Sequence, residues 1–167
     1  MFESLGGLPA HPLVVHLPVV LVPLAAIGAL LMAIRPAWLQ RFGVVVATLA
    51  GLGFVGSLLA AGSGEELEDS FRAAGETISG ALHDHAEMGE SVELLAGLFF
   101  VLVLAWVLFA AWRRKVGEEH AVARVRRPKV VAIVLALLVV LSGFTATASV
   151  YLTGHSGAKS VWEDTAP

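Results

Sequence analysis

The 167-residue sequence contains no cysteine. This excludes disulfide bonds, thiolate metal sites, iron–sulfur clusters and covalently attached c-type haem. Charge is also scarce, because aspartate, glutamate, lysine and arginine make up only 15% of the chain while 57% of the residues are hydrophobic. A soluble domain of this length exposes far more charge. With a mean hydropathy of +0.80, the chain is expected to use a lipid bilayer as the solvent for most of its surface.

Four apolar runs are long enough to cross a hydrocarbon core of about 30 Å, which takes about 20 helical residues. Only helices are expected there, because unpaired backbone groups are not tolerated in lipid. The sequence therefore predicts an all-α membrane protein, a single domain that is a four-transmembrane-helix bundle. The expected helices cover residues 13–34, 42–61, 82–112 and 129–153, and an outer segment at 62–81 begins with Gly62-Ser63-Gly64 as a helix stop.

Two prolines, Pro18 and Pro23, fall inside the first run. Proline lacks an amide hydrogen and crowds the preceding turn, so this helix is expected to be kinked or locally unwound near its start. The preceding residues, MFESLGGLPAHP, carry an acid and no basic residue, which is not the pattern of a cleaved signal peptide. The first helix is therefore expected to remain in the protein. No internal repeat is evident between the two helical hairpins.

Charges are segregated along the chain in a way that predicts its orientation. The link at 35–41 carries two basic residues and no acid, and the link at 113–129 carries seven basic residues and two acids. The other side has only Arg72 and Lys159 as cations, against twelve acids. By the positive-inside rule both basic links are cytoplasmic. The N and C termini and the 62–93 segment are then expected on the non-cytoplasmic side.

Five of the six histidines fall on this predicted outer side, on three segments that are far apart in the sequence. They are His11 and His16 at the start of the first helix, His83 and His85 at the start of the third, and His155 just past the end of the fourth. Histidines at a membrane boundary either cap and connect helices or form a functional site, and their clustering favours a functional site. Without cysteine, imidazole is the softest strong ligand available for Fe, Cu, Ni or Zn.

Two cofactor chemistries suit this histidine cluster. Haem b could be held between one imidazole of the first helix and one of the third or fourth, since four-helix bundles hold cofactors between facing helices. Its propionates could then pair with Arg72 or Lys159. The alternative is a compact Zn, Cu or Fe site in which Glu87 or Glu90 joins histidines of different segments. A cofactor-free structural subunit of a larger membrane complex is the third possibility.

Three features carry a family resemblance: HPLVVHLP around His11 and His16, the histidine pair before the third helix, and TGHSG around His155. Together they resemble the bacterial membrane protein family called domain of unknown function 2231, over essentially the whole chain. Relatives in that family occur fused to Rieske-type or c-type cytochrome domains. The resemblance implies an electron carrier or redox subunit of the bacterial inner membrane, with a redox partner on the extracytoplasmic side, and not a stand-alone enzyme.

The resemblance also ranks the candidate haem ligands. His16 and His155 come first because both fall within motifs similar to those of the family; His11 and His85 follow, and His83 comes last. The sequence contains no phosphate-binding loop or nucleotide fingerprint. Its basic link RVRRPK is expected to contact anionic lipid headgroups and not nucleic acid. An oligomer remains open at this point.

Overall fold

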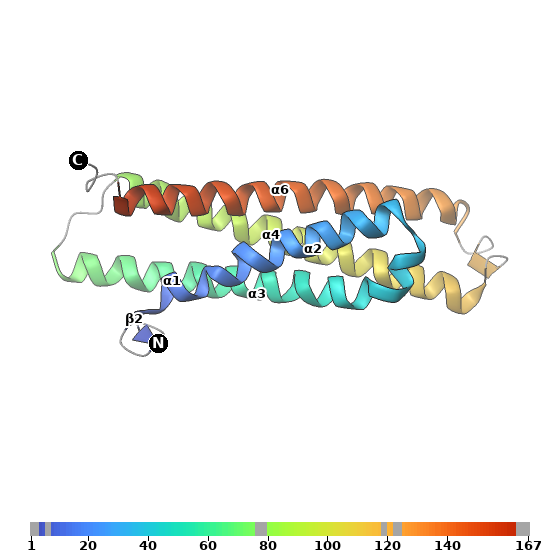
Figure 1. Ribbon diagram of the computed structural model, residues 1–167, viewed down its shortest axis with the longest axis horizontal. Helices are drawn as coiled ribbons and strands as arrows, with labels where there is room; N and C mark the ends of the chain where they lie inside the picture. Colours follow the sequence, from blue (N-terminus) through green and yellow to red (C-terminus); the bar gives the residue numbers. More distant parts are fainter. Residues whose placement is uncertain (1–3, 6–7, 76–79, 118–119, 122–124, 163–167) are drawn as a thin grey trace.

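The computed structural model describes residues 4–5, 8–75, 80–117, 120–121 and 125–162. Within this part of the chain, four long helices run alongside one another as a bundle (Figure 1). The long helices are α2 (His16–Ile34), α3 (Ala37–Ala73), α4 (Gly80–Val116) and α6 (Pro128–Trp162). They are preceded by a short helix, α1 (Ala10–Val14), and by the two-residue strands β1 (Ser4–Leu5) and β2 (Leu8–Pro9), which pair antiparallel.

Each long helix contains a stretch apolar enough to cross a membrane, with a mean hydropathy between 2.2 and 2.8. The predicted all-α membrane fold with four transmembrane helices is confirmed. Helices α3 and α4 have 37 residues each, which corresponds to about 55 Å at a rise of 1.5 Å per residue. Because the hydrocarbon core takes up only about 30 Å, both helices project beyond it.

The end of α3 differs from the expectation that Gly62-Ser63-Gly64 stops the helix. The helix continues through these residues to Ala73. It ends at Gly75, which has a φ of +79° and whose amide donates to the carbonyl of Arg72. Gly117, with a φ of +78°, ends α4 in the same way. A left-handed residue after the last turn is the position that favours glycine, whereas a glycine that keeps helical dihedral angles is no stop signal.

Helix α6 also extends further than expected. The fourth helix was predicted to end at 153, but it continues to Trp162. Residues 153–157, the TGHSG motif, therefore lie inside a helix and not in a loop after it. Helical geometry then decides which of these side chains face the bundle and which face outward.

The first helix has a one-residue interruption at Val15, which keeps helical dihedral angles (φ −59°, ψ −22°), so the predicted kink or unwinding is limited to a missing hydrogen bond. Helix α1 ends at Val14 and α2 begins at His16. Pro18 has no amide hydrogen to donate to the carbonyl of Val14, four residues earlier, and this missing bond accounts for the interruption. Helix α2 continues through Pro23 without a second break.

The long helices pack as a ring, in the order α2, α3, α4, α6 and back to α2. Glycines let aromatic side chains of one helix approach the backbone of the next. Phe99 of α4 lies against Gly143 of α6, and Phe54 of α3 lies against Gly97 of α4. A methyl group added at either glycine would come within 2.9 Å of the aromatic ring. Close contact through small residues is the usual way in which helices associate in lipid.

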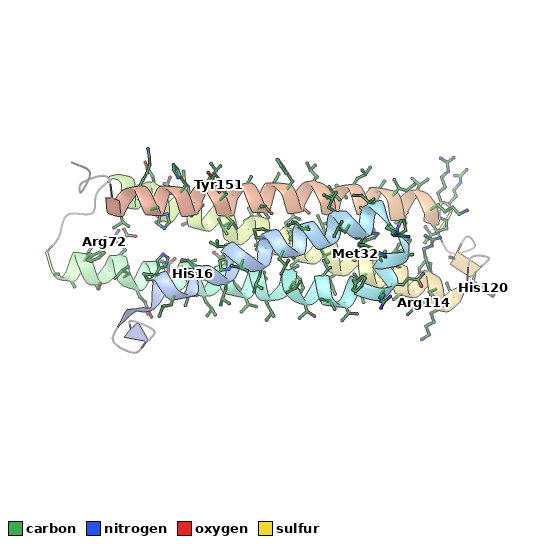
Figure 2. The ribbon with its side chains drawn as sticks, in the orientation of Figure 1. His16, Met32, Arg72, Arg114, His120 and Tyr151 are labelled. Atoms are coloured by element: carbon green, nitrogen blue, oxygen red, sulfur yellow. The ribbon has the colours of Figure 1, made fainter. Side chains whose placement is uncertain are left out.

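The connections place basic residues at one end of the bundle. Figure 2 shows Arg114 and His120 at one end and Arg72 toward the other. The short connection between α2 and α3 lies at the same end as Arg114 (Figure 1). Strand β2 and the last turn of α6 lie at the opposite end. The positive-inside rule predicts that the end with Arg114 is cytoplasmic and that the end with β2 is not.

This orientation can be tested with single cysteines, because the chain has no other thiol. Ser70 and His120 are both exposed and lie toward opposite ends of the bundle. A membrane-impermeant thiol reagent should label Ser70→Cys in intact cells and should label His120→Cys only after the membrane is permeabilised. The reverse pattern would place the β2 end in the cytoplasm.

Candidate functional site

His11 of α1 and His85 of α4 lie side by side. Their ring centroids are 6.2 Å apart and their ring planes are nearly perpendicular, at 86°. Both residues are half-buried. Since α1 belongs to the first helical hairpin and α4 to the second, this histidine pair connects the two halves of the bundle near the end that carries β2.

The partners of His11 lie on α3. Its Nδ1 is 2.9 Å from the carbonyl oxygen of Ala60 and 3.3 Å from Oγ of Ser63. The hydroxyl of Ser63 donates to the same carbonyl, at 3.0 Å. Because that hydroxyl hydrogen is already engaged, both partners can only accept from His11. This geometry favours the tautomer in which Nδ1 carries the hydrogen.

The partners of His85 lie on α6. Its Nδ1 is 3.2 Å from Oγ of Ser156, and the backbone of Thr153 interacts with the same imidazole. The hydroxyl of Thr153 also donates to the carbonyl of Met88, at 3.4 Å, which joins α6 to α4 about one turn beyond His85. The imidazole of His85 is thus held against α6 as that of His11 is held against α3.

A glycine lies against each imidazole. A Cβ atom added at Gly64 would be 3.2 Å from Cε1 of His11, and one added at Gly157 would be 2.7 Å from Cε1 of His85. By contrast, a Cβ atom at Gly62 or Gly154 would meet nothing within 4 Å. Glycine at 64 and 157 therefore provides space that any other residue would fill.

The same local arrangement thus occurs twice. We call it an imidazole seat: a residue whose backbone faces the ring, a serine three residues later, and the glycine that follows the serine. The first seat is Ala60, Ser63 and Gly64, which holds His11, and the second is Thr153, Ser156 and Gly157, which holds His85. This local repeat, at the same end of α3 and α6, was not expected from the sequence.

The two histidines ranked first from the sequence are not part of this pair. His155 is exposed and its ring stacks on that of Tyr151, with centroids 6.3 Å apart and planes at 10°. His16 is exposed at the start of α2 (Figure 2). In the TGHSG motif it is therefore Ser156 and Gly157, and not the histidine, that face the bundle.

The comparison with known families covers nearly the whole chain. Residues 7–166 match the family described as predicted membrane protein (DUF2231). The chain belongs to this family. The resemblance seen in HPLVVHLP and TGHSG is thus confirmed. No curated protein and no solved structure matches the chain.

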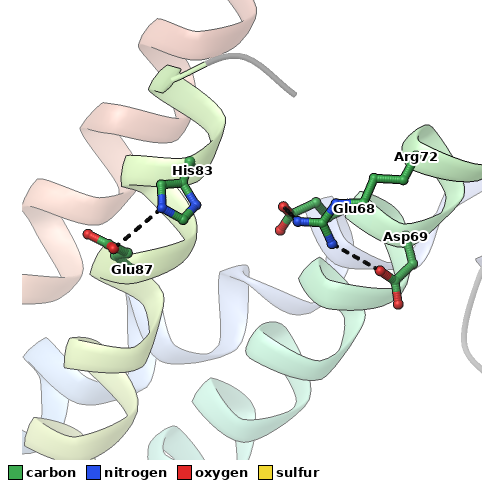
Figure 3. A network of polar contacts seen from close by, with 5 residues as sticks. All are labelled: Glu68, Asp69, Arg72, His83 and Glu87. Atoms are coloured by element: carbon green, nitrogen blue, oxygen red, sulfur yellow. Dashed lines mark hydrogen bonds and ion pairs between the residues drawn. The ribbon is translucent and has the colours of Figure 1, made fainter. Parts of the chain in front are cut away.

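The remaining candidates in this DUF2231 protein lie on the surface of α4. Nε2 of His83 is 3.5 Å from Oε1 of Glu87 on the same helix, and both side chains are exposed (Figure 3). Glu90 is exposed as well. Among the described residues, no group of three or more histidine, aspartate or glutamate side chains is placed to hold a metal ion. The compact site expected as the alternative, in which Glu87 or Glu90 joins the histidines, is therefore not assembled.

Arg72 was a candidate to pair with an anionic group of a cofactor. In the structure its guanidinium pairs with Glu68 and Asp69 on α3, with 3.2 Å between Nη1 and Oδ1 of Asp69 (Figure 3). These are exposed contacts within one helix, of the kind that contributes little to stability.

The close approach at the second seat leads to a stability prediction. Gly157→Ala should destabilise the protein by about 1–3 kcal/mol, because the added methyl group overlaps the ring of His85. Gly154→Ala, one turn earlier on the same helix, has free space and should be neutral or stabilising by up to about 1 kcal/mol. Unfolding in mixed detergent micelles measures the difference, and equal effects of the two substitutions would contradict the tight packing at Gly157.

Proposed function

We propose that this DUF2231 protein binds haem b through His11 and His85 and carries electrons at the extracytoplasmic side of the membrane. The observation that supports this most is the pairing of two half-buried imidazoles from different hairpins, His11 with Nδ1 bound to α3 and His85 with Nδ1 bound to α6. The proposal replaces the pair ranked first from the sequence, His16 and His155, which are exposed.

The number of ligands favours haem over a bare metal ion. A structural zinc ion takes four protein ligands and a catalytic one takes three. Two imidazoles cannot complete such a site, and no larger group of histidine and carboxylate side chains is assembled among the described residues. A haem iron already has four porphyrin nitrogens, so two histidines complete its coordination.

The separation of the rings also suits this role. A bond from a metal to an imidazole nitrogen is about 2 Å long, and the nitrogen lies roughly 1 Å from its ring centroid, so two imidazoles on opposite sides of one metal have centroids about 6 Å apart. The observed separation between His11 and His85 is 6.2 Å. Aromatic rings that merely pack edge to face have similar centroid distances. The distance alone therefore does not separate a ligand pair from a packing contact, and the hydrogen bonds at Nδ1 are the further evidence.

Those hydrogen bonds favour ligation. A histidine that binds a metal usually donates its other ring hydrogen to a carbonyl, carboxylate or water, which fixes the ring orientation and raises the basicity of the ligating nitrogen. His11 has this arrangement with Ala60, and His85 has a serine hydroxyl at the equivalent nitrogen. Haem, when bound, would supply reversible one-electron chemistry; the chain supplies the two ligands and holds them at the outer end of the bundle.

The test is an optical spectrum of the protein purified in mild detergent after expression with ample haem. The wild type should give the pyridine haemochrome spectrum of haem b, and dithionite should change its absorption. His11→Ala and His85→Ala should each lose most of the bound haem or lose six-coordinate iron, and free imidazole should partly restore it. His16→Ala and His155→Ala are matched controls and should keep the wild-type spectrum, because both side chains lie outside the pair.

Two results would contradict the proposal. Wild-type protein without haem, with stoichiometric Zn, Cu or non-haem Fe in elemental analysis, would favour a metal-binding protein. Haem that is lost in His16→Ala and His155→Ala but retained in His11→Ala and His85→Ala would keep the cofactor and return its ligands to the exposed pair. Gel filtration in detergent identifies any variant that has lost its fold.

A further inference from the structure

We infer that the two imidazole seats set the protonation of the histidine pair, so that Nδ1–H is donated to the helix and Nε2 is the nitrogen left to bind a ligand. The residues that position His11 and His85 in this way are Ser63, Gly64, Ser156 and Gly157. It rests on the proposed function for the identity of the ligand, but the protonation itself is a property of the protein without haem.

The first seat admits only one arrangement of hydrogens. The carbonyl oxygen of Ala60 can only accept a hydrogen bond, and the hydroxyl of Ser63 donates its hydrogen to that carbonyl. His11 must therefore donate from Nδ1 to reach them, at 2.9 and 3.3 Å. The ring cannot turn away from the carbonyl freely, because its Cε1 edge lies against Gly64.

The second seat has the same residue spacing on α6. Ser156 stands three residues after Thr153, as Ser63 stands three residues after Ala60, and in each case the serine oxygen is next to Nδ1 of a histidine. Gly157 lies even closer to its ring than Gly64 does, since the added Cβ atom would be 2.7 Å from Cε1 of His85 and 3.2 Å from both Nδ1 and Nε2. From this repeated spacing we expect both histidines to carry their hydrogen on Nδ1.

Another serine–glycine pair on α6, Ser142 and Gly143, contacts a ring without belonging to an imidazole seat. Ser142 donates to the carbonyl of Val139, three residues earlier, and Gly143 lies against the ring of Phe99. The backbone arrangement is the same, but a phenyl ring has no hydrogen to donate. A serine–glycine pair on a helix thus accommodates a ring in general, and it fixes a protonation state only where the ring is an imidazole.

The experiment uses the full-length, haem-free protein labelled with nitrogen-15 in its histidine rings. Long-range proton–nitrogen spectra, recorded where the rings are neutral, distinguish Nδ1–H from Nε2–H. His11→Gln and His85→Gln assign the two signals. Both residues should be mainly Nδ1–H in the wild type. Gly64→Ala should abolish that majority for His11, and Gly157→Ala should abolish it for His85.

The chain provides matched controls. Gly62→Ala and Gly154→Ala add the same methyl group on the same helices where nothing lies within 4 Å, and should leave both signals unchanged. Ser156→Ala should lower the Nδ1–H fraction of His85, while Ser142→Ala removes a serine with no histidine partner among its described bonds and should not. The serine variants keep the test valid if an alanine at 64 or 157 prevents folding.

The outcomes separate this inference from the proposed function. Nδ1–H signals that respond as described support the seats whether or not the purified protein contains haem. Mainly Nε2–H rings in the wild type, or equal responses to Gly62→Ala and Gly64→Ala, overturn the inference even if the protein proves to be red. Where haem is bound, Ser156→Ala should also shift the midpoint potential of the haem, and Ser142→Ala should leave that potential unchanged.

Discussion

A backbone that crosses hydrocarbon has to satisfy its own hydrogen bonds, and the rest of this structure follows from that constraint. Helix α2 is continuous through Pro23, and α3 is continuous through Gly62. Glycines with positive φ follow the last turns of α3 and α4. A helix that continues beyond the membrane keeps its backbone hydrogen bonds. The end turns of α3 and α6, which contain the two imidazole seats, are therefore helical, as is the start of α4, which contains His85.

The same constraint shapes the polar contact between α1 and α3. A helical carbonyl keeps one lone pair after its bond to the amide four residues later. In this chain the carbonyl of Ala60 shares that lone pair between the hydroxyl of Ser63 and Nδ1 of His11. An imidazole held in this way is oriented by the backbone and not by a flexible side chain. Mutations of the surrounding apolar residues should therefore change its protonation less than a methyl group added at Gly64.

The sequence was sufficient for the architecture and for part of the site. Hydropathy and charge gave the four helices, and Pro18 predicted the break before α2, because these signals depend on composition and on single residues. The pairing of His11 with His85 needed the structure. His155 and Ser156 are neighbours in the sequence but face different directions, since successive residues on a helix differ by about 100°. The dipeptide Ser-Gly occurs four times in the chain, so it could not by itself identify two seats.

What distinguishes the two seats from the third serine–glycine pair is only the ring that faces them. Phe99 packs against Gly143, while His11 and His85 pack against Gly64 and Gly157 and each place Nδ1 beside a serine oxygen. A half-buried lone pair at a membrane boundary is unfavourable unless it finds a donor or a metal. The rings of His11 and His85 come from different hairpins and have centroids 6.2 Å apart, so a ligand bound to both would bridge the two hairpins. Binding there would hold the hairpins together, so removal of either histidine should weaken both the cofactor site and the association of the two halves.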